Sequence, residues 1–281
     1  MKLSLLPKAR YFLTVILLLF FIIPGTSHAA GVLPDVETRS IIQSVDGYAK
    51  VVGDKKPKQL RHGALSIAKR KALESARKYL ESGTKGKYEI VKNRHGKFIT
   101  VLDKKDFGIE NSSRYHVRLK TEVRYRQKNS TMEEAAPLTV KIWTDKKKYK
   151  EGEQINIYIE GNRDFYAKIV KMGASGDIVQ LLPNNYRQIS LFKKGETYRI
   201  PDEGDRFDLK VFPPFGTERF IVYASELPLS RINMKTIAKG LYRYRGTKRS
   251  LDRSVRSTVP VGKGRPVEFY EAVRTILKAP H

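Results

Sequence analysis

The sequence predicts an α+β protein in which a small segment, with one helix packed on a mostly antiparallel sheet, precedes an all-β, sandwich-like segment. Three patterns lead to this prediction: an alanine-rich helical stripe, a strictly alternating strand after it, and a later series of short strands separated by turns. The 281 residues suit one or two domains, and 40% hydrophobic residues are enough for packed cores.

The first segment is expected to span 30–128. Residues 39–52 are rich in β-forming residues and lead into the turn-forming run 53–57. A helix is predicted from Lys58 to Leu80, with Gly83 ending it, because small or apolar residues recur at every fourth position. These residues are Leu60, Ala64, Ala68, Ala72, Ala76 and Leu80. Such a stripe lets a helix approach a sheet closely, because alanine side chains are short.

Three more strands are expected to complete the first sheet. The strands 88–92 and 98–102 flank the turn 93–96 and are predicted to pair as a local hairpin. The third strand, 115–125, alternates buried and outward residues, so its outward cations stand about 6.5 to 7 Å apart. These cations are Arg114, Arg118, Lys120, Arg124 and Arg126. They are candidates for binding an anionic surface, and a solvated sheet face is the alternative.

A second segment, 138–281, follows a linker predicted at 129–137, where the periodicity stops before Pro137. Turn-forming Gly, Pro and Asn residues separate short strands at regular spacing, and this pattern indicates a β-sandwich. The strands are predicted at 138–143, 154–160, 165–172, 177–182, 197–200, 207–212 and 219–225. Further on, Met234–Tyr242 is predicted as a helical turn and Val267–Leu277 as a closing strand, with a short helix as the alternative to that strand.

A second concentration of cations lies between the last two of these elements. It comprises Arg243, Arg245, Lys248 and Arg249, interleaved with Tyr244 and followed by Arg253 and Arg256. Arginine beside aromatic rings can hold sugars or single-stranded nucleic acid through stacking and charge. The first four cations are therefore further candidates for binding an anionic surface, and a solvated loop is the alternative.

The amino terminus predicts export. Three cations precede an uncharged apolar run, 11–23, which is followed by Pro24, Gly25 and then Ser27-His28-Ala29. This order predicts a signal peptide over 1–29, cleaved after Ala29. The apolar run is shorter than the roughly 20 residues of a membrane-spanning helix, so no transmembrane span is expected after cleavage, and a retained anchor is the alternative. Because the chain has no cysteine, it cannot be a lipoprotein, and we expect a periplasmic location.

The net charge constrains the partners. The full chain carries +26, and the leader accounts for three positive charges and no acidic residue, which leaves +23. This charge attracts anionic polymers over about 10 Å at ordinary salt. Outside the cytosol the candidate partners are anionic lipid, lipopolysaccharide and peptidoglycan, and nucleic acid is not expected. General solubility is the alternative role of the charge.

Residues 138–229 resemble the bacterial domain-of-unknown-function family 4384, an exported β-rich module. The resemblance rests on turn and strand motifs that are specific in combination. They include Tyr149-x-x-Gly152-Glu153, Phe165-Tyr166-Ala167, Gly176-Asp177-Ile178-Val179, Leu181-Leu182-Pro183-Asn184, Pro214-Phe215-Gly216-Thr217-Glu218 and Ala224-Ser225-Glu226-Leu227-Pro228. Glycines and prolines at these points are typical of turns that fix a fold. The resemblance implies no catalytic residue.

Residues 44–126 are similar to the amino-terminal domain of the flagellar assembly protein T group and to the LPP20 type of lipoprotein domain. The shared features are the Gly47-Tyr48-Ala49 strand, the alanine-rich helix and the alternating strand. This resemblance implies a structural or assembly role at the outer membrane. The chain lacks the lipid-attachment cysteine of such lipoproteins, so direct anchoring is not implied.

No catalytic, cofactor-binding or metal-binding residue is predicted. His62, His95 and His116 show no metal-ligand spacing, and there is no Gly-x-Ser-x-Gly elbow or phosphate-binding loop. We therefore expect a non-catalytic envelope protein that acts as a binding, assembly or scaffold factor and contacts envelope protein partners. One alternative is a sensory or regulatory module in envelope stress signalling. Another is a cell-wall hydrolase, for which Glu203 and Asp205 are the acidic candidates.

Overall fold

The computed structural model describes residues 36–53, 56–84, 87–127, 136–238, 240–262 and 264–281. All of them belong to one compact unit, 32–281. The expected signal peptide and all but the last two residues of the expected linker lie outside the described residues. Within the described ranges, neither helix is both long enough and apolar enough to cross a membrane.

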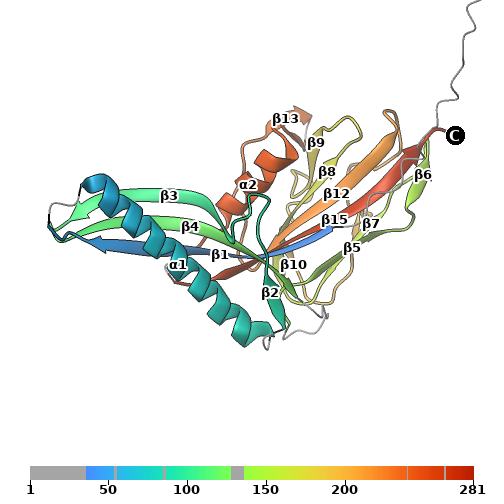
Figure 1. Ribbon diagram of the computed structural model, residues 1–281. Coiled ribbons are helices and arrows are strands. Elements are labelled where there is room, and N and C mark those ends of the chain that lie inside the picture. Colours follow the sequence, from blue (N-terminus) through green and yellow to red (C-terminus); the bar gives the residue numbers. More distant parts are fainter. Residues whose placement is uncertain (1–35, 54–55, 85–86, 128–135, 239, 263) are drawn as a thin grey trace, which may run out of the picture. The chain divides into compact units, whose positions relative to one another are not determined.

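A large, mostly antiparallel sheet forms most of the unit (Figure 1). Its strand order is β13-β14-β9-β8-β12-β15-β1-β4-β2, while β3 also pairs with β4, β10 with β8, and β6 in parallel with β15. Strands in this sheet are β1 (Val36–Lys50), β2 (Tyr88–Ile90), β3 (Ile99–Glu110), β4 (Arg114–Gln127), β6 (Lys148–Lys150), β8 (Phe165–Met172), β9 (Ile178–Leu182), β10 (Leu191–Phe192), β12 (Gly216–Ser225), β13 (Lys235–Ala238), β14 (Leu241–Tyr244) and β15 (Val267–Ala279). A smaller sheet has the order β11-β7-β5, from β5 (Val140–Thr144), β7 (Ile157–Gly161) and β11 (Tyr198–Ile200). The helices are α1 (Pro57–Thr84) and α2 (Lys248–Thr258).

Strand β1 joins the two halves of the chain. Its first residues pair with β15, from Val36 opposite Val273 to Ile42 opposite Val267, and from Arg39 onward it also pairs with β4. The large sheet therefore includes strands from both sides of 129–137. The predicted closing strand at the carboxyl terminus is confirmed as β15, and the division into domains at 129–137 stays a prediction.

Helix α1 packs on β1 and β4 through the predicted stripe. Leu60, the four alanines and Leu80 are all at most 2% exposed. The contact with β1 is close: a Cβ atom at Gly47 would lie 2.0 Å from the carbonyl oxygen of Ala64. Only glycine fits there, and the helix-on-sheet arrangement follows from this pairing of small residues. The helix runs one residue past Gly83, which lies in its last turn instead of ending it.

The predicted hairpin of 88–92 with 98–102 is wrong. Strands β2 and β3 do not pair with each other; both pair with the edge of β4, where Ile90 lies opposite Tyr125 and Ile99 opposite Val123. The turn between them forms as expected, because the Asn93 side chain accepts hydrogen bonds from the backbone of His95 and Lys97. Two short apolar runs around a turn do not distinguish a hairpin from two strands placed end to end along a third.

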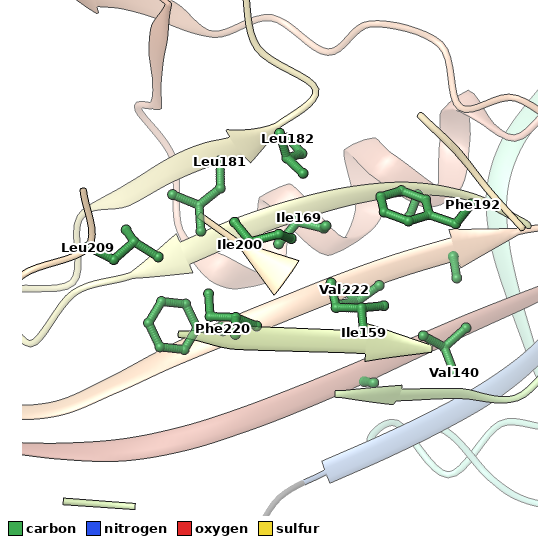
Figure 2. Close-up of a cluster of buried hydrophobic side chains, with 14 of the residues drawn as sticks. Val140, Ile159, Ile169, Leu181, Leu182, Phe192, Ile200, Leu209, Phe220 and Val222 are labelled. Carbon is green, nitrogen blue, oxygen red and sulfur yellow. The ribbon is translucent and has the colours of Figure 1, made fainter. Parts of the chain in front are cut away.

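The carboxyl-terminal half is sandwich-like, as predicted. A cluster of buried side chains fills the space between the smaller sheet and the large one. Figure 2 shows Val140, Ile159 and Ile200 from the smaller sheet among Ile169, Phe220 and Val222 from the large one, together with other side chains. The strand register places this cluster and α1 on one face of the large sheet and α2 on the other, because paired strand residues share a face.

Three predictions in this half are wrong. Met234–Tyr242 forms no helical turn; most of it belongs to the β13–β14 hairpin. The expected cationic loop contains α2, so the segment is not all-β. Residues 207–212 form no strand and contribute only the isolated bridge between Lys210 and Gln154. The short strands β6 and β10 were not predicted, because two or three residues are too few to show a period.

Candidate functional site: a cationic cavity beside α2

Helix α2 begins at a capping residue and packs on the sheet through a narrow apolar stripe. The Thr247 side chain accepts a hydrogen bond from the backbone N–H of Ser250 at 3.2 Å, which caps the first turn. Leu251 and Val255 are buried one turn apart against the sheet, in a cluster that includes Tyr223 and Phe269. The helix therefore covers the face of the sheet opposite α1 (Figure 1).

A buried ionic network joins α2 to β4 and β15. Arg256, only 2% exposed, donates hydrogen bonds from Nε to Glu122 Oε1 at 2.7 Å and from Nη2 to Glu271. Lys248 Nζ lies 2.6 Å from the other Glu271 oxygen and 2.7 Å from Asp252. Burial alone would raise the pKa of Glu271, but Arg256 and Lys248 hold that pKa below its ordinary value. The network is charged and structural.

A cavity of about 530 Å³ adjoins this network. It is lined by α2, by the outer face of β4 and by the turn 93–95. The cavity brings Arg124, from the first predicted cationic surface, together with Lys248 and Arg249, from the second. Two regions more than a hundred residues apart in the sequence thus contribute to one site.

Cations and carboxylates balance at the floor of the cavity but not at its rim. Arg124, Lys248 and Arg256 contact the carboxylates of Glu122, Asp252 and Glu271. At the rim lie three exposed arginines for which the described residues supply no carboxylate partner. They are Arg94, whose Nε donates to His95 at 3.1 Å, and Arg249 and Arg253 on α2. These three rim arginines carry the uncompensated charge of the site.

The placement of the rim arginines on α2 is electrostatically unfavourable for the isolated protein. Arg249 lies in the first turn, where the helix dipole disfavours cations and where there is no acidic residue. Arg253 follows four residues later on the same face, and like charges at that spacing repel. A nearby anion would relieve both effects. Local violations of this kind are expected at functional sites more than elsewhere.

The other predicted cations of β4 have internal partners or lie apart from the cavity. Arg118 forms a bidentate pair with Asp46, at 2.8 and 3.3 Å, and Arg114 pairs with Glu110 at 3.4 Å. Lys120 Nζ donates to the carbonyl oxygens of Ser257 and Val259 at the end of α2, and burial lowers its pKa. Arg126 is exposed outside the cavity. The outer face of β4 is therefore partly covered and is no continuous row of free cations.

The remaining predicted cations, Arg243 and Arg245, lie on the exposed surface of β14 and in the turn after it. They do not line the cavity. Anion binding by them stays a prediction. Two of the three rim arginines were not among the predicted candidates. Arg94 lies in a turn and carries no periodic signal, and Arg253 was noted only as following the second concentration of cations. Helix α2 could have been predicted from its sequence, because a capping residue, Thr247, is followed by two apolar residues four positions apart, Leu251 and Val255.

Two of the residues weighed for catalysis or metal binding, His116 and Asp205, have structural partners. His116 is stacked between the Tyr48 and Phe107 rings and lies 2.8 Å from Asp46 and 2.6 Å from Glu110. Asp205 accepts hydrogen bonds from Arg187 and from the backbone N–H of Asp202, whereas Glu203 is exposed. In the described part of the chain, no group of three or more His, Asp or Glu residues is arranged to hold a metal ion.

Comparison with known proteins finds one family model that matches a segment of the chain. Residues 148–228 match the family described as "Domain of unknown function (DUF4384)", which confirms the resemblance predicted for the carboxyl-terminal half. The match does not reach 44–126, and the resemblance of that segment to flagellar assembly and LPP20 domains has no support in the comparisons. No curated protein and no solved structure matches the chain.

Proposed function

We propose that this protein is a non-catalytic, exported envelope factor that binds an anionic polymer at the cavity rim and contacts protein partners through its sandwich. The observation that carries the proposal is the group of three rim arginines, exposed around a cavity whose floor is already neutralised. The predicted leader and the absence of cysteine place the protein in the periplasm in this proposal. Its partners there are anionic lipid, lipopolysaccharide or peptidoglycan, together with envelope proteins.

The chemistry of the rim suits phosphate or carboxylate groups. A guanidinium is planar, stays charged at any physiological pH and can donate two parallel hydrogen bonds to such a group. Arg249 and Arg253 lie one turn apart on α2, and Arg94 lies on the facing turn, so the rim presents several contacts to a chain of anions. The high net charge adds long-range attraction toward the same polymers.

The test measures binding of the purified protein to cell-wall sacculi and to vesicles with anionic lipid at increasing salt. We expect binding that weakens steeply with salt, because the contacts are between exposed charges. The variant Arg249→Glu plus Arg253→Glu should lose tenfold or more in affinity without any loss of thermal stability.

The matched control is Lys58→Glu plus Lys69→Glu, which makes the same change in net charge on exposed positions of α1. If only the net charge mattered, both variants would lose affinity equally, and the cavity would have no special role. Absence of binding to either surface, combined with capture of an envelope receptor, would favour the sensory alternative and contradict the polymer proposal.

A further inference from the structure

A second cavity, of about 370 Å³, lies where β8 exchanges one neighbouring strand for another. Residues 169–172 of β8 pair with β9, whereas Phe165 and Tyr166 pair with β10. Between these two strands the chain leaves the sheet as the loop 183–190. The cavity opens beside this loop and shares no lining residue with the cationic cavity at α2.

Lys168 lies in the cavity wall, at the point where the strand next to β8 changes from β10 to β9. It is only 4% exposed and is paired in the sheet with Tyr223 of β12. The described residues give its ammonium group no hydrogen-bond or ion-pair partner. Charged residues are rarely buried without a partner, because desolvation of an isolated ammonium is costly. The position therefore requires an explanation that the folded chain alone does not supply.

The surroundings of Lys168 are cationic. Arg231 also lines the cavity, and no Asp or Glu is among the lining residues. Burial lowers the pKa of Lys168, and the neighbouring charge of Arg231 lowers it further. Burial, together with the nearby charges of Glu271 and Asp252, raises the pKa of Tyr223 on the neighbouring strand β12. An anion in the cavity would offset the two positive charges.

The rest of the wall is suited to an apolar body with a polar end. Pro183, Ile232 and Met234 supply apolar surface, and the ring of Tyr242 lies beside them. The amide of Asn184 is fully engaged in its own loop, where it binds Leu181, Tyr186 and Arg187, whereas the exposed Gln188 amide has no partner within the described ranges. The volume lies in the usual range for small-molecule sites.

We propose that this cavity binds a small organic oxyanion, with its carboxylate or phosphate group between Lys168 and Arg231 and its apolar body against Ile232 and Met234. The site goes beyond polymer binding at α2 and does not depend on it. Six of the lining residues lie inside the segment that matches DUF4384, so the ligand would belong to the function of that module.

The test uses benzoate, phenyl phosphate and inorganic phosphate as probes, with neutral benzamide as the control ligand. Calorimetry and thermal unfolding of the intact protein should show binding of benzoate or phenyl phosphate at millimolar concentration or below, and none of benzamide. A preference between the two aromatic anions identifies the oxyanion as a carboxylate or a phosphate. Binding of inorganic phosphate alone would show that the apolar wall contributes nothing and would overturn the proposal.

Two variants test the cations. Lys168→Met should lose at least tenfold in affinity while its melting temperature stays the same or rises, because it removes an uncompensated buried charge. Arg231→Gln, at an exposed position, should lose affinity without affecting folding. Lys141→Met, at an exposed position of β5, is the matched control and should bind normally. Equal binding by all three variants, or no binding of any anion to the wild type, would contradict the site.

Discussion

The two helices cover opposite faces of the large sheet by different physical means. Helix α1 contacts the sheet through alanines and through Gly47, so its interface is apolar and close. Helix α2 uses Leu251 and Val255 but also buries Arg256 against two carboxylates. An apolar interface tolerates little change in volume, whereas an ionic one tolerates little change in charge. Substitutions at each interface separate these two kinds of dependence.

Replacing Arg256 by Met should destabilise the protein by about 3 to 5 kcal/mol, because Glu122 and Glu271 would remain buried without their common partner. Urea unfolding measures the change. The control is Arg253→Met, one turn earlier and exposed, which should change stability by no more than about 0.5 kcal/mol. Equal effects of the two variants would show that α2 is held by its apolar stripe alone.

The stability of the wild type and that of Arg256→Met should depend differently on pH. In the wild type the pKa of Glu271 lies below its ordinary value of 4.5, so its contribution to stability is complete above that value and is lost as the pH falls through the lowered pKa. In Arg256→Met, Glu122 and Glu271 keep Arg124 and Lys248 but lose their shared arginine, so their pKa values should be higher than in the wild type and they should gain protons at a higher pH. The stability difference between the two proteins should therefore shrink as the pH decreases, and a constant difference from pH 7 to pH 4 would contradict the network.

Adding a methyl group at the α1 interface should destabilise the protein less than removing the buried charge of Arg256 at the α2 interface. Gly47→Ala places a Cβ atom 2.0 Å from the Ala64 carbonyl oxygen, so the helix must shift, at a cost of about 1 to 3 kcal/mol. Gly83→Ala, in the last turn of the same helix and facing open space, should instead leave stability unchanged or raise it by about 0.5 kcal/mol. Chemical denaturation of both variants distinguishes steric overlap from a general effect of glycine replacement.

The smallest expected effect concerns the exposed rim. Arg249→Glu exchanges a cation for an anion in the first turn of α2, where the helix dipole favours negative charge. Stability should rise by about 0.3 to 1 kcal/mol, measured by thermal unfolding at low salt. A loss of stability would mean that Arg249 has an internal partner and is not available to a ligand.

The difference between the helices also explains what the sequence could predict. The α1 stripe and the alternation of β4 are long and apolar, so both were predicted, with most boundaries within a few residues. Helix α2 is short and rich in Arg and Ser, and its buried Arg256 resembles a solvated residue in any pattern based on hydrophobicity. For the same reason β3 was predicted to end at Leu102, whereas it continues through the charged run Asp103–Asp106 along an exposed edge.

The site was predictable only in part, because it depends on long-range pairing. Arg124 and Arg249 were both candidates, but only the packing of α2 on β4 brings them to one cavity. Arg118 and Lys120 looked equivalent to Arg124 along the strand, yet Asp46 and the end of α2 bind them. A carboxylate supplied by another strand cannot be seen in the pattern of a single one.

Binding of an anionic polymer at the cavity rim is tested most directly by observing the rim arginines during binding. Side-chain NMR signals of arginine Nε–H groups, assigned by single substitutions, would be followed while a short anionic oligomer such as polyphosphate is titrated. We expect the signals of Arg94, Arg249 and Arg253 to shift together at the lowest ligand concentrations, while those of Arg126 and Arg243 stay unchanged. Equal shifts of all five would contradict a defined site at the cavity.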